Sequence, residues 1–214
     1  MNAPPVPAQV HVVDDDAVVL RSISRVLDAS GFAAVEWGSS LAFLRSAQFR
    51  APTCVLLDVR MPDSTGPEVQ EELRRRGISV PIIFLTAHAD VPTTVRAMKG
   101  GAVDFLLKPV DPATLLEVVR RAIARNEEAA AVDARGEALR VRHASLTERE
   151  RQVMELIVSG ASSRETGDAL GIAENTVKVH RVRLMAKMEA GSLADLVRMA
   201  IALGIRAGDL DHSR

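Results

Sequence analysis

The sequence contains a single cysteine, Cys54, so it predicts no disulfide and no cysteine-rich metal site. Cys54 lies in the apolar run of residues 54–57, where a small buried side chain is its expected role. The formal net charge is −1, so a case for nucleic acid or membrane binding needs local patches. With 47% apolar and 26% charged residues among 214, the composition is typical of a folded protein with one large domain or two small ones.

Long apolar segments are also missing. The N-terminus has three prolines by position 7 but no basic start and no apolar core, so we expect no signal peptide. No apolar run approaches the ~20 residues that a helix needs to cross a bilayer. We therefore expect a protein of the reducing cytoplasm that has no membrane partner.

Residues 10 to about 125 alternate between short apolar runs and helix-length stretches. The apolar runs predict strands buried on both faces. These strands cover residues 10–13, 33–37, 54–57, 82–85 and 105–107, and the helices cover 17–30, 40–48, 67–76, 93–100 and 112–125. Five β–α units in a row predict a parallel sheet covered by helices, within a first domain of residues 1–127.

The strand pattern ends after residue 127. Residues 128–144 are rich in Ala, Glu and Arg and predict a linker that continues the preceding helix, with Gly136 as a candidate hinge. Residues 145–214 predict an all-α second domain, because paired capping residues precede several apolar-periodic runs. The pairs are Thr147 with Glu150, Ser162 with Glu165 and Ser192 with Asp195, and a further helix is expected over residues 176–188.

Acidic residues follow two of the predicted strands. Asp14, Asp15 and Asp16 follow the first strand, and Asp58 follows the third. Ligands of open parallel sheets bind beyond the carboxyl ends of the strands, so these carboxylates are expected to converge on one site. Left alone they would repel one another, and Mg²⁺, which prefers carboxylate oxygens, would relieve the repulsion.

Two further residues are expected at the same edge of the sheet. Thr86 follows the fourth strand and Lys108 follows the fifth. A metal, a lysine and a hydroxyl around a carboxylate suit phosphoryl transfer, in which Asp58 would attack phosphorus as the nucleophile. The alternative is that these are solvated loop residues. That alternative is strong for one aspartate alone and weak for five suitable residues at four strand ends.

These residues match a known pattern, because roughly residues 8–127 resemble the receiver domain of two-component response regulators, a flavodoxin-like (CheY-like) fold. The resemblance rests on Asp14-Asp15, on Asp58 with residues 60–62 and Gly66, on Thr86-Ala87 and on Lys108-Pro109. It implies that a sensor histidine kinase phosphorylates Asp58. It implies that Asp14, Asp15, Asp58 and the backbone carbonyl of Arg60 bind Mg²⁺, and that Lys108, beside a cis peptide bond, holds the phosphoryl group.

The same resemblance implies a switch, in which the Thr86 hydroxyl bonds the phosphoryl group and Phe105 moves inward. A plain core aromatic is the alternative for Phe105. The side chain of Arg60 would shield the phosphoryl group or simply be exposed. His88 is interpreted as a solvated loop residue, and Asp16 as a spectator or secondary metal contact.

The second domain contains a helix-turn-helix pattern. Helices over residues 165–170 and 176–188 are separated by Gly171-Ile172, and the second helix of such a motif enters the major groove. Helical spacing places Val177, Leu184 and Met188 on the core face. His180 would lie nearer to that face, whereas Lys178, Val179, Val182 and Ala186 face outward, flanked by Arg181, Arg183 and Lys187.

The local positive charge of the second predicted helix is the main support for DNA binding. Residues 177–187 contain four cations and no acid, whereas residues 145–214 balance ten Lys and Arg against ten Asp and Glu. A solvated helix face is the alternative, and it is weaker on the second helix of this motif.

Residues 146–204 resemble the LuxR-type output domain of NarL/FixJ regulators, and the domain order is most similar to the FixJ subgroup. The resemblance rests on residues 146–150, Gly160, residues 170–172, residues 176–181 and residues 192–197. It implies that Lys178, Val179 and Val182 reach bases, that Arg164, Arg181 and Arg183 hold phosphates, and that the last helix forms a dimer contact. Two departures, Gly167 within a helix and Ala173 in place of a serine cap, are each expected to cost about 1 kcal/mol unless Asn175 compensates for the second.

We therefore expect a transcription regulator, not an enzyme, in which phosphorylation of Asp58 controls dimerisation on double-stranded promoter DNA. RNA polymerase stays open as a further partner. An aspartyl phosphatase is the alternative from another class, but it would need a second acid/base carboxylate and a cap. Asp63 is the nearest candidate, in a turn after Pro62, and the sequence has no cap insertion. A relic receiver is disfavoured because the acidic set is complete.

Overall fold

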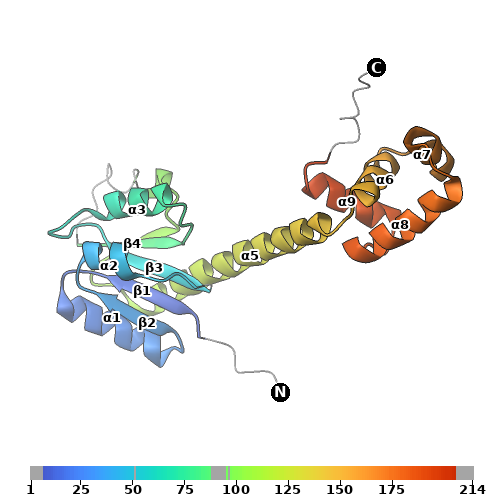
Figure 1. The fold of residues 1–214 in the computed structure, drawn as a ribbon. Coiled ribbons are helices and arrows are strands. Elements are labelled where there is room, and N and C mark those ends of the chain that lie inside the picture. Colours follow the sequence, from blue (N-terminus) through green and yellow to red (C-terminus); the bar gives the residue numbers. More distant parts are fainter. Residues whose placement is uncertain (1–6, 51, 88–94, 96, 206–214) are drawn as a thin grey trace. The chain divides into compact units, whose positions relative to one another are not determined.

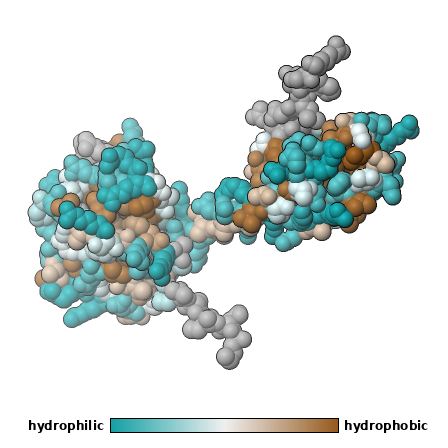
Figure 2. All heavy atoms as spheres, viewed as in Figure 1, coloured by the Kyte–Doolittle hydropathy of each residue, from teal (hydrophilic) through white to brown (hydrophobic). Residues whose placement is uncertain are grey.

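The chain forms two compact units, Met1–Ala130 and Ala131–Arg214, which we describe separately (Figure 1). The structure is a computed structural model that describes residues 7–50, 52–87, 95 and 97–205. Within these residues no helix is both long enough and apolar enough to span a membrane. Hydrophilic residues cover most of the surface that Figure 2 shows on each unit.

The first unit is built on a parallel sheet of five strands in the order β2-β1-β3-β4-β5. The strands are β1 (Gln9–Val13), β2 (Ala33–Trp37), β3 (Thr53–Asp58), β4 (Ile82–Thr86) and β5 (Asp104–Leu107). Every residue of β3 and β4 is buried, as their unbroken apolar sequences predict for central strands of a parallel sheet. The predicted α/β fold class is confirmed.

Helices cover both faces of this sheet. The core on one face joins the sheet to α1 (Ala17–Ala29) and α5 (Pro112–Ala144), and the core on the other face joins it to α2 (Ser40–Ser46) and α3 (Gly66–Arg75). Figure 1 shows the same layers. Of the helix expected over residues 93–100, residues 95 and 97–99 are helical, and residues 93, 94 and 96 lie outside those that the structure describes.

The buried stripe of α5 ends at Asn126. Its buried residues recur at helical spacing, at positions 115, 118, 119, 122, 123 and 126. The Asn126 side chain is 8% exposed, and its Oδ1 accepts a hydrogen bond of 2.9 Å from the backbone N–H of Thr53, the first residue of β3. The helix continues to Ala144, so residues 128–144 are helical and Gly136 lies inside a helix.

The chain's one tryptophan lies in an aromatic cluster at the end of β2. The Trp37 indole N–H donates to Nδ1 of the buried His11 at 3.0 Å, and the rings of Phe43 and Phe49 pack against His11. Burial lowers the pKa of His11, although a backbone hydrogen bond at Gln48 acts in the opposite direction. The imidazole of His11 is therefore neutral and accepts a hydrogen bond from the indole N–H.

The second unit, over its described residues 131–205, packs four short helices around one apolar core. They are α6 (Glu148–Val158), α7 (Ser163–Leu170), α8 (Glu174–Met188) and α9 (Leu193–Ala202). Capping boxes begin α6 at Thr147 and α7 at Ser162, and Ser192 caps α9, as predicted. The α8 helix begins two residues before its predicted start at 176, because Ala173 takes the N-cap position.

A buried ion pair joins α6 to α8. The Glu150 side chain is 4% exposed, and its Oε2 lies 2.6 Å from Nζ of Lys187. Lys187 also donates to the backbone carbonyl of Ser145 at 3.1 Å. Burial alone would raise the pKa of Glu150, but hydrogen bonds from Lys187 and Thr147 outweigh it and lower that pKa. Lys187 therefore joins the end of α8 to the start of α6.

Candidate functional site

The acidic residues meet where the strand order reverses. β1 and β3 are neighbours in the sheet, with Val13 opposite Leu57. The next residues of the two segments, Asp14 and Asp58, therefore lie side by side. Asp14, Asp15 and Asp58 each contribute one carboxylate oxygen to a group of three that all lie within 4.8 Å of one another. Asp14 and Asp58 are buried, at 0% and 7% exposed, whereas Asp15 is exposed. The converging site predicted for the carboxyl ends of the strands is present at these three residues.

Lys108 reaches this cluster from the end of β5. Its Nζ lies 2.5 Å from Oδ2 of Asp14 and 3.0 Å from Oδ1 of Asp58. Its backbone N–H donates to the carbonyl of Thr86, the last residue of β4, at 2.7 Å. The Lys108–Pro109 peptide bond is cis. Asp15, Asp58, Thr86 and Lys108 therefore come from strand ends that lie side by side in the sheet.

The site favours positive charge. Burial raises the pKa of Asp58; the hydrogen bond and charge of Lys108 act against this, and the Asp14 carboxylate adds to it. Burial would lower the pKa of Lys108, but its hydrogen bonds to Asp14 and Asp58 outweigh this and raise it. Two buried carboxylates thus share one ammonium. Such an oxygen-rich cluster could hold a divalent cation, because hard cations prefer carboxylate ligands.

Close packing fixes the backbone that carries Asp58. A Cβ atom at Gly66 would lie 2.6 Å from the Asp58 carbonyl oxygen and 2.7 Å from Cε1 of Phe84, so this position needs glycine. The Gly66 N–H donates to the carbonyl of Val59 at 2.9 Å and closes the loop between β3 and α3. Arg60 lies in this loop, where its backbone forms a bridge with Thr65.

Thr86 lies beside the cluster at the end of β4, and Phe105 lies on the neighbouring strand β5. Thr86 is 2% exposed. Phe105 is half-buried, and its ring centroid lies 6.3 Å from that of Phe84. A partly buried ring of this kind is what the predicted switch requires.

Asp16 is the N-cap of α1, and its part as a spectator or secondary metal contact stays a prediction. Its Oδ1 accepts from the N–H of Val18 at 2.7 Å and caps α1, and its own N–H donates to Oδ1 of Asp14 at 3.0 Å. An aspartate directly before an apolar-periodic run is a typical N-cap, so the signal was present in the sequence. His88 lies outside the described residues.

The exposed surface of α8 carries the side chains predicted to reach DNA. Val177, Leu184 and Met188 are each 0% exposed, whereas Val179 and Val182 are 45% and 70% exposed. The four cations assigned to DNA lie at or near the surface. Arg164, Lys178 and Arg183 are exposed, and Arg181 is half-buried. Nζ of Lys178 lies 2.8 Å from Oε1 of Glu174, a surface contact between neighbouring turns that a phosphate or base could replace.

The two departures within the helix-turn-helix have different outcomes. Ala173, the N-cap of α8, provides no side-chain hydrogen bond to the start of the helix, and among the described residues Asn175 forms no side-chain bond that replaces it. Gly167, in contrast, is required by packing. A Cβ at this position would lie 2.7 Å from the carbonyl oxygen of Ile172, in the turn before α8. The expected cost to the helix stays a prediction, and the close approach of Ile172 explains why glycine stands at this position.

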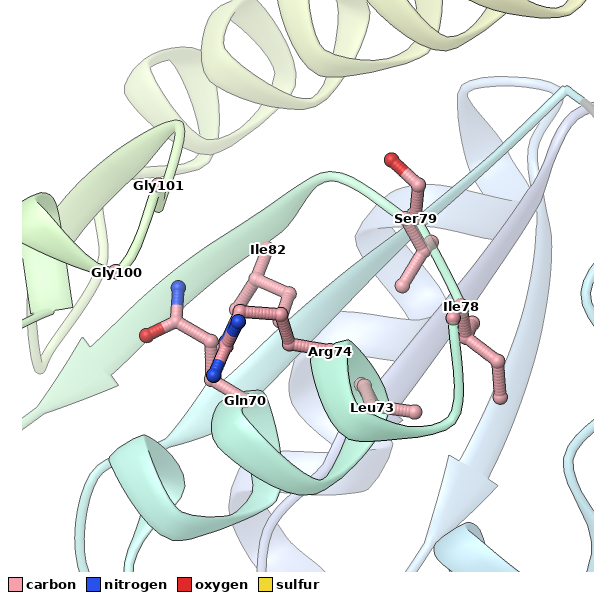
Figure 3. Close-up of a pocket in the computed structure, with 10 residues that line it drawn as sticks. Gln70, Leu73, Arg74, Ile78, Ser79, Ile82, Gly100 and Gly101 are labelled. Carbon is pink, nitrogen blue, oxygen red and sulfur yellow. The ribbon is translucent and has the colours of Figure 1, made fainter.

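A surface pocket of about 370 Å³ lies elsewhere in the first unit (Figure 3). Gln70 and Arg74 of α3 line it, with Ser79, Ile82 and the Gly100-Gly101 pair. Ile82 is the first residue of β4, so the pocket lies at the amino ends of the strands, away from the acidic cluster. It takes no part in the site at Asp58.

Comparison with known proteins agrees with this arrangement. Residues 10–120 match the family described as "Response regulator receiver domain", and residues 144–200 match "Bacterial regulatory proteins, luxR family". The fold and its two matched domains define a two-component response regulator with a DNA-binding output domain. The chain belongs to the NarL/FixJ family of these regulators, in which it is similar to the FixJ proteins.

Three relatives illustrate the likeness over both domains. The chain is 43% identical to "Transcriptional regulatory protein FixJ" of Azorhizobium caulinodans, over 94% of this chain and 95% of that protein. It is 40% identical to "Tetrathionate response regulatory protein TtrR" of Salmonella typhimurium, over 89% and 91%. Among solved structures, the response regulator StyR matches with a TM-score of 0.85 and 38% identity, over 92% and 99%.

Proposed function

We propose that Asp58 accepts a phosphoryl group from a sensor histidine kinase and that phosphorylation controls binding of the second domain to promoter DNA. The observation that supports this most directly is the position of Lys108 Nζ, within 3.0 Å of both Asp14 and Asp58 at the carboxyl ends of the strands. We assign Mg²⁺ to Asp14, Asp15, Asp58 and the backbone carbonyl of Arg60. The three carboxylates fit it, since their oxygens lie close enough together to share one ion.

The chemistry follows from these residues. An oxygen of the Asp58 carboxylate forms a bond to phosphorus, and the bond from phosphorus to the kinase histidine nitrogen breaks, leaving its electron pair on nitrogen. Lys108 moves from Asp58 to a phosphoryl oxygen and keeps its contact with Asp14. Bound Mg²⁺ supplies charge neutralisation during this transfer. From the resemblance to receiver domains, we assign to the Thr86 hydroxyl a hydrogen bond to the phosphoryl group and to the Phe105 ring an inward turn.

An aspartyl phosphatase fits the structure less well. Such an enzyme needs a free acid/base carboxylate near the nucleophile. The nearest candidate from the sequence, Asp63, accepts hydrogen bonds at its Oδ2 from Ser39 and from the N–H of Leu41. This carboxylate oxygen is therefore already bonded to the start of α2, and a relative that is 43% identical is named a transcriptional regulatory protein.

The second domain supplies the DNA contacts. Lys178, Val179 and Val182 are assigned to base edges in the major groove, and Arg164, Arg181 and Arg183 to phosphates. A footprint of genomic fragments bound by the phosphorylated protein would identify the target sequence. Protein that leaves every fragment unprotected would overturn this assignment.

Removing Lys178 and Arg181 together should weaken DNA binding by about ten-fold, because one base contact and one phosphate contact are lost. Fluorescence anisotropy with the footprinted fragment measures the affinity. The slope of log affinity against log salt concentration should become shallower by the contribution of about one phosphate contact. The matched control is Arg135→Ala with Arg140→Ala, which removes two exposed cations from α5. Equal losses in both double variants would mean that overall charge, and not the α8 surface, determines affinity.

Phosphorylation should also raise the fraction of homodimer, through a contact that includes α9. Sedimentation velocity with and without acetyl phosphate measures this fraction, with Asp58→Asn as the unphosphorylated control. A monomer in both states would refute the coupling. The setting is the cytoplasm, and RNA polymerase is the further partner of a regulator bound at a promoter.

A further inference from the structure

The loop that follows the phosphoacceptor is bonded to the start of α2. Oδ2 of Asp63 accepts from Oγ of Ser39 at 2.7 Å and from the N–H of Leu41 at 3.1 Å. One residue further along each segment, Oγ of Ser40 and Oγ of Ser64 share a hydrogen bond of 2.7 Å. We call these three hydrogen bonds the α2 clamp.

The loop between β3 and α3 is anchored to the sheet at its start, because the Val59 N–H donates to a carbonyl of β4 at 2.9 Å and the Val59 and Met61 side chains are buried in the core. Further along, the Met61 N–H donates to the Ser64 carbonyl at 3.3 Å, and the Thr65 N–H donates to Glu68 at 2.8 Å. The α2 clamp joins residues 63 and 64 to another element, because its partners are 22 to 24 residues apart in the chain.

The same segment before α2 also holds the other acidic loop. The backbone N–H of Asp14 donates to the carbonyl of Trp37 at 3.0 Å. Trp37 ends β2, and Ser39 follows two residues later as the N-cap of α2. One short stretch, residues 37–41, is therefore bonded both to Asp14 and to the loop in which Arg60 lies.

We propose that Asp63 is a positioning residue that, through the α2 clamp, sets the distance between the Asp14 loop and the Arg60 loop and so prepares the cation site. This rests on the proposed function, since it assigns the cation to those two loops. Asp63 touches no phosphoryl group or cation itself. Without the clamp residues 63 and 64 lose their hydrogen bonds to α2, and the cation site at the start of the loop becomes less well formed.

Asp63 has two other properties that could mimic this effect. Its negative charge attracts any cation nearby, and its bond to the Leu41 N–H helps to cap α2. Asp63→Asn tests the effect of the charge alone, because the amide oxygen can still accept both hydrogen bonds. Asp28→Ala tests the effect of losing a surface carboxylate contact elsewhere, because exposed Asp28 accepts from the N–H of Ala34 at 3.2 Å near the amino end of β2.

The test measures binding of Mn²⁺, a probe that shares the preference of Mg²⁺ for carboxylate oxygens, by electron paramagnetic resonance of the free ion in the full-length protein. Asp63→Ala should raise the Kd for Mn²⁺ by about five-fold, less than the ten- to hundred-fold lost with direct outer-shell partners. Asp63→Asn and Asp28→Ala should each stay within about two-fold of wild type. Ser39→Ala with Ser64→Ala, which keeps Asp63, should match Asp63→Ala and replaces it if that variant fails to fold.

Wild-type affinity in both clamp variants would overturn the proposal while leaving the proposed function intact. An equal loss in Asp63→Asn and Asp63→Ala would also overturn it, because charge alone would then be responsible. If the wild-type protein binds no Mn²⁺ and takes no label from acetyl phosphate, the proposed function fails, and the role of Asp63 fails with it.

Discussion

Replacing Asp58 with asparagine should abolish phosphoryl labelling of the protein by acetyl phosphate and Mg²⁺. An amide nitrogen or oxygen does not replace the carboxylate nucleophile. The side chains have nearly the same shape, so the sheet should fold normally. Burial and the nearby Asp14 raise the pKa of Asp58, so removing this carboxylate should relieve repulsion within the cluster and leave Lys108 paired with Asp14.

Intact mass spectrometry and radiolabelling measure this prediction. Asp28→Asn is the control, since it makes the same substitution at an exposed aspartate of the same unit and should label as wild type does. Label that persists in the Asp58→Asn protein would place the phosphoacceptor elsewhere. Urea unfolding of the two proteins separates chemical loss from structural loss.

Leu184→Ala should destroy DNA binding while leaving phosphorylation of the first unit unchanged. Leu184 is 0% exposed in the core of the second unit, and truncating a buried leucine costs about 2–5 kcal/mol. A helical domain of this size has little stability to spare, so much of it should be unfolded. The first unit has cores of its own on both faces of its sheet and should be unaffected.

DNA anisotropy and acetyl phosphate labelling on one preparation measure this separation. Val132→Ala is the control, because Val132 is 64% exposed on α5 and its truncation should change neither property. Loss of labelling in Leu184→Ala would mean that the units do not fold independently. It would also contradict the domain limits at residues 127 and 145, which stay predictions.

Periodic patterns explain why much of this structure could be predicted from sequence. The unbroken apolar runs at β3 and β4 match strands buried at every position, and the pairs Thr147–Glu150 and Ser162–Glu165 form capping boxes where expected. Asp14 and Asp58 could be placed together because neighbouring parallel strands end at one edge of a sheet. Each of these signals lies within a few residues of the chain or follows from the topology.

Contacts between distant segments could not be predicted in the same way. Glu150 and Lys187 are 37 residues apart, and neither residue type indicates the other as its partner. Ser39 and Asp63 are 24 residues apart, in loops whose approach depends on how α2 packs. The packing role of Gly167 could not be predicted, because helix propensity describes the helix alone, whereas the Ile172 carbonyl that excludes a Cβ belongs to the following turn.

The Trp37–His11 pair gives this protein an internal optical probe. Trp37 is the sole tryptophan and the sequence has no tyrosine, so intrinsic emission excited at ~295 nm comes from the first unit alone. Circular dichroism, in contrast, follows the helices of both units. Recording the two signals during one denaturant titration therefore resolves the unfolding of each unit without a dye or a label, and each variant named above can be assigned to the half of the chain that it weakens.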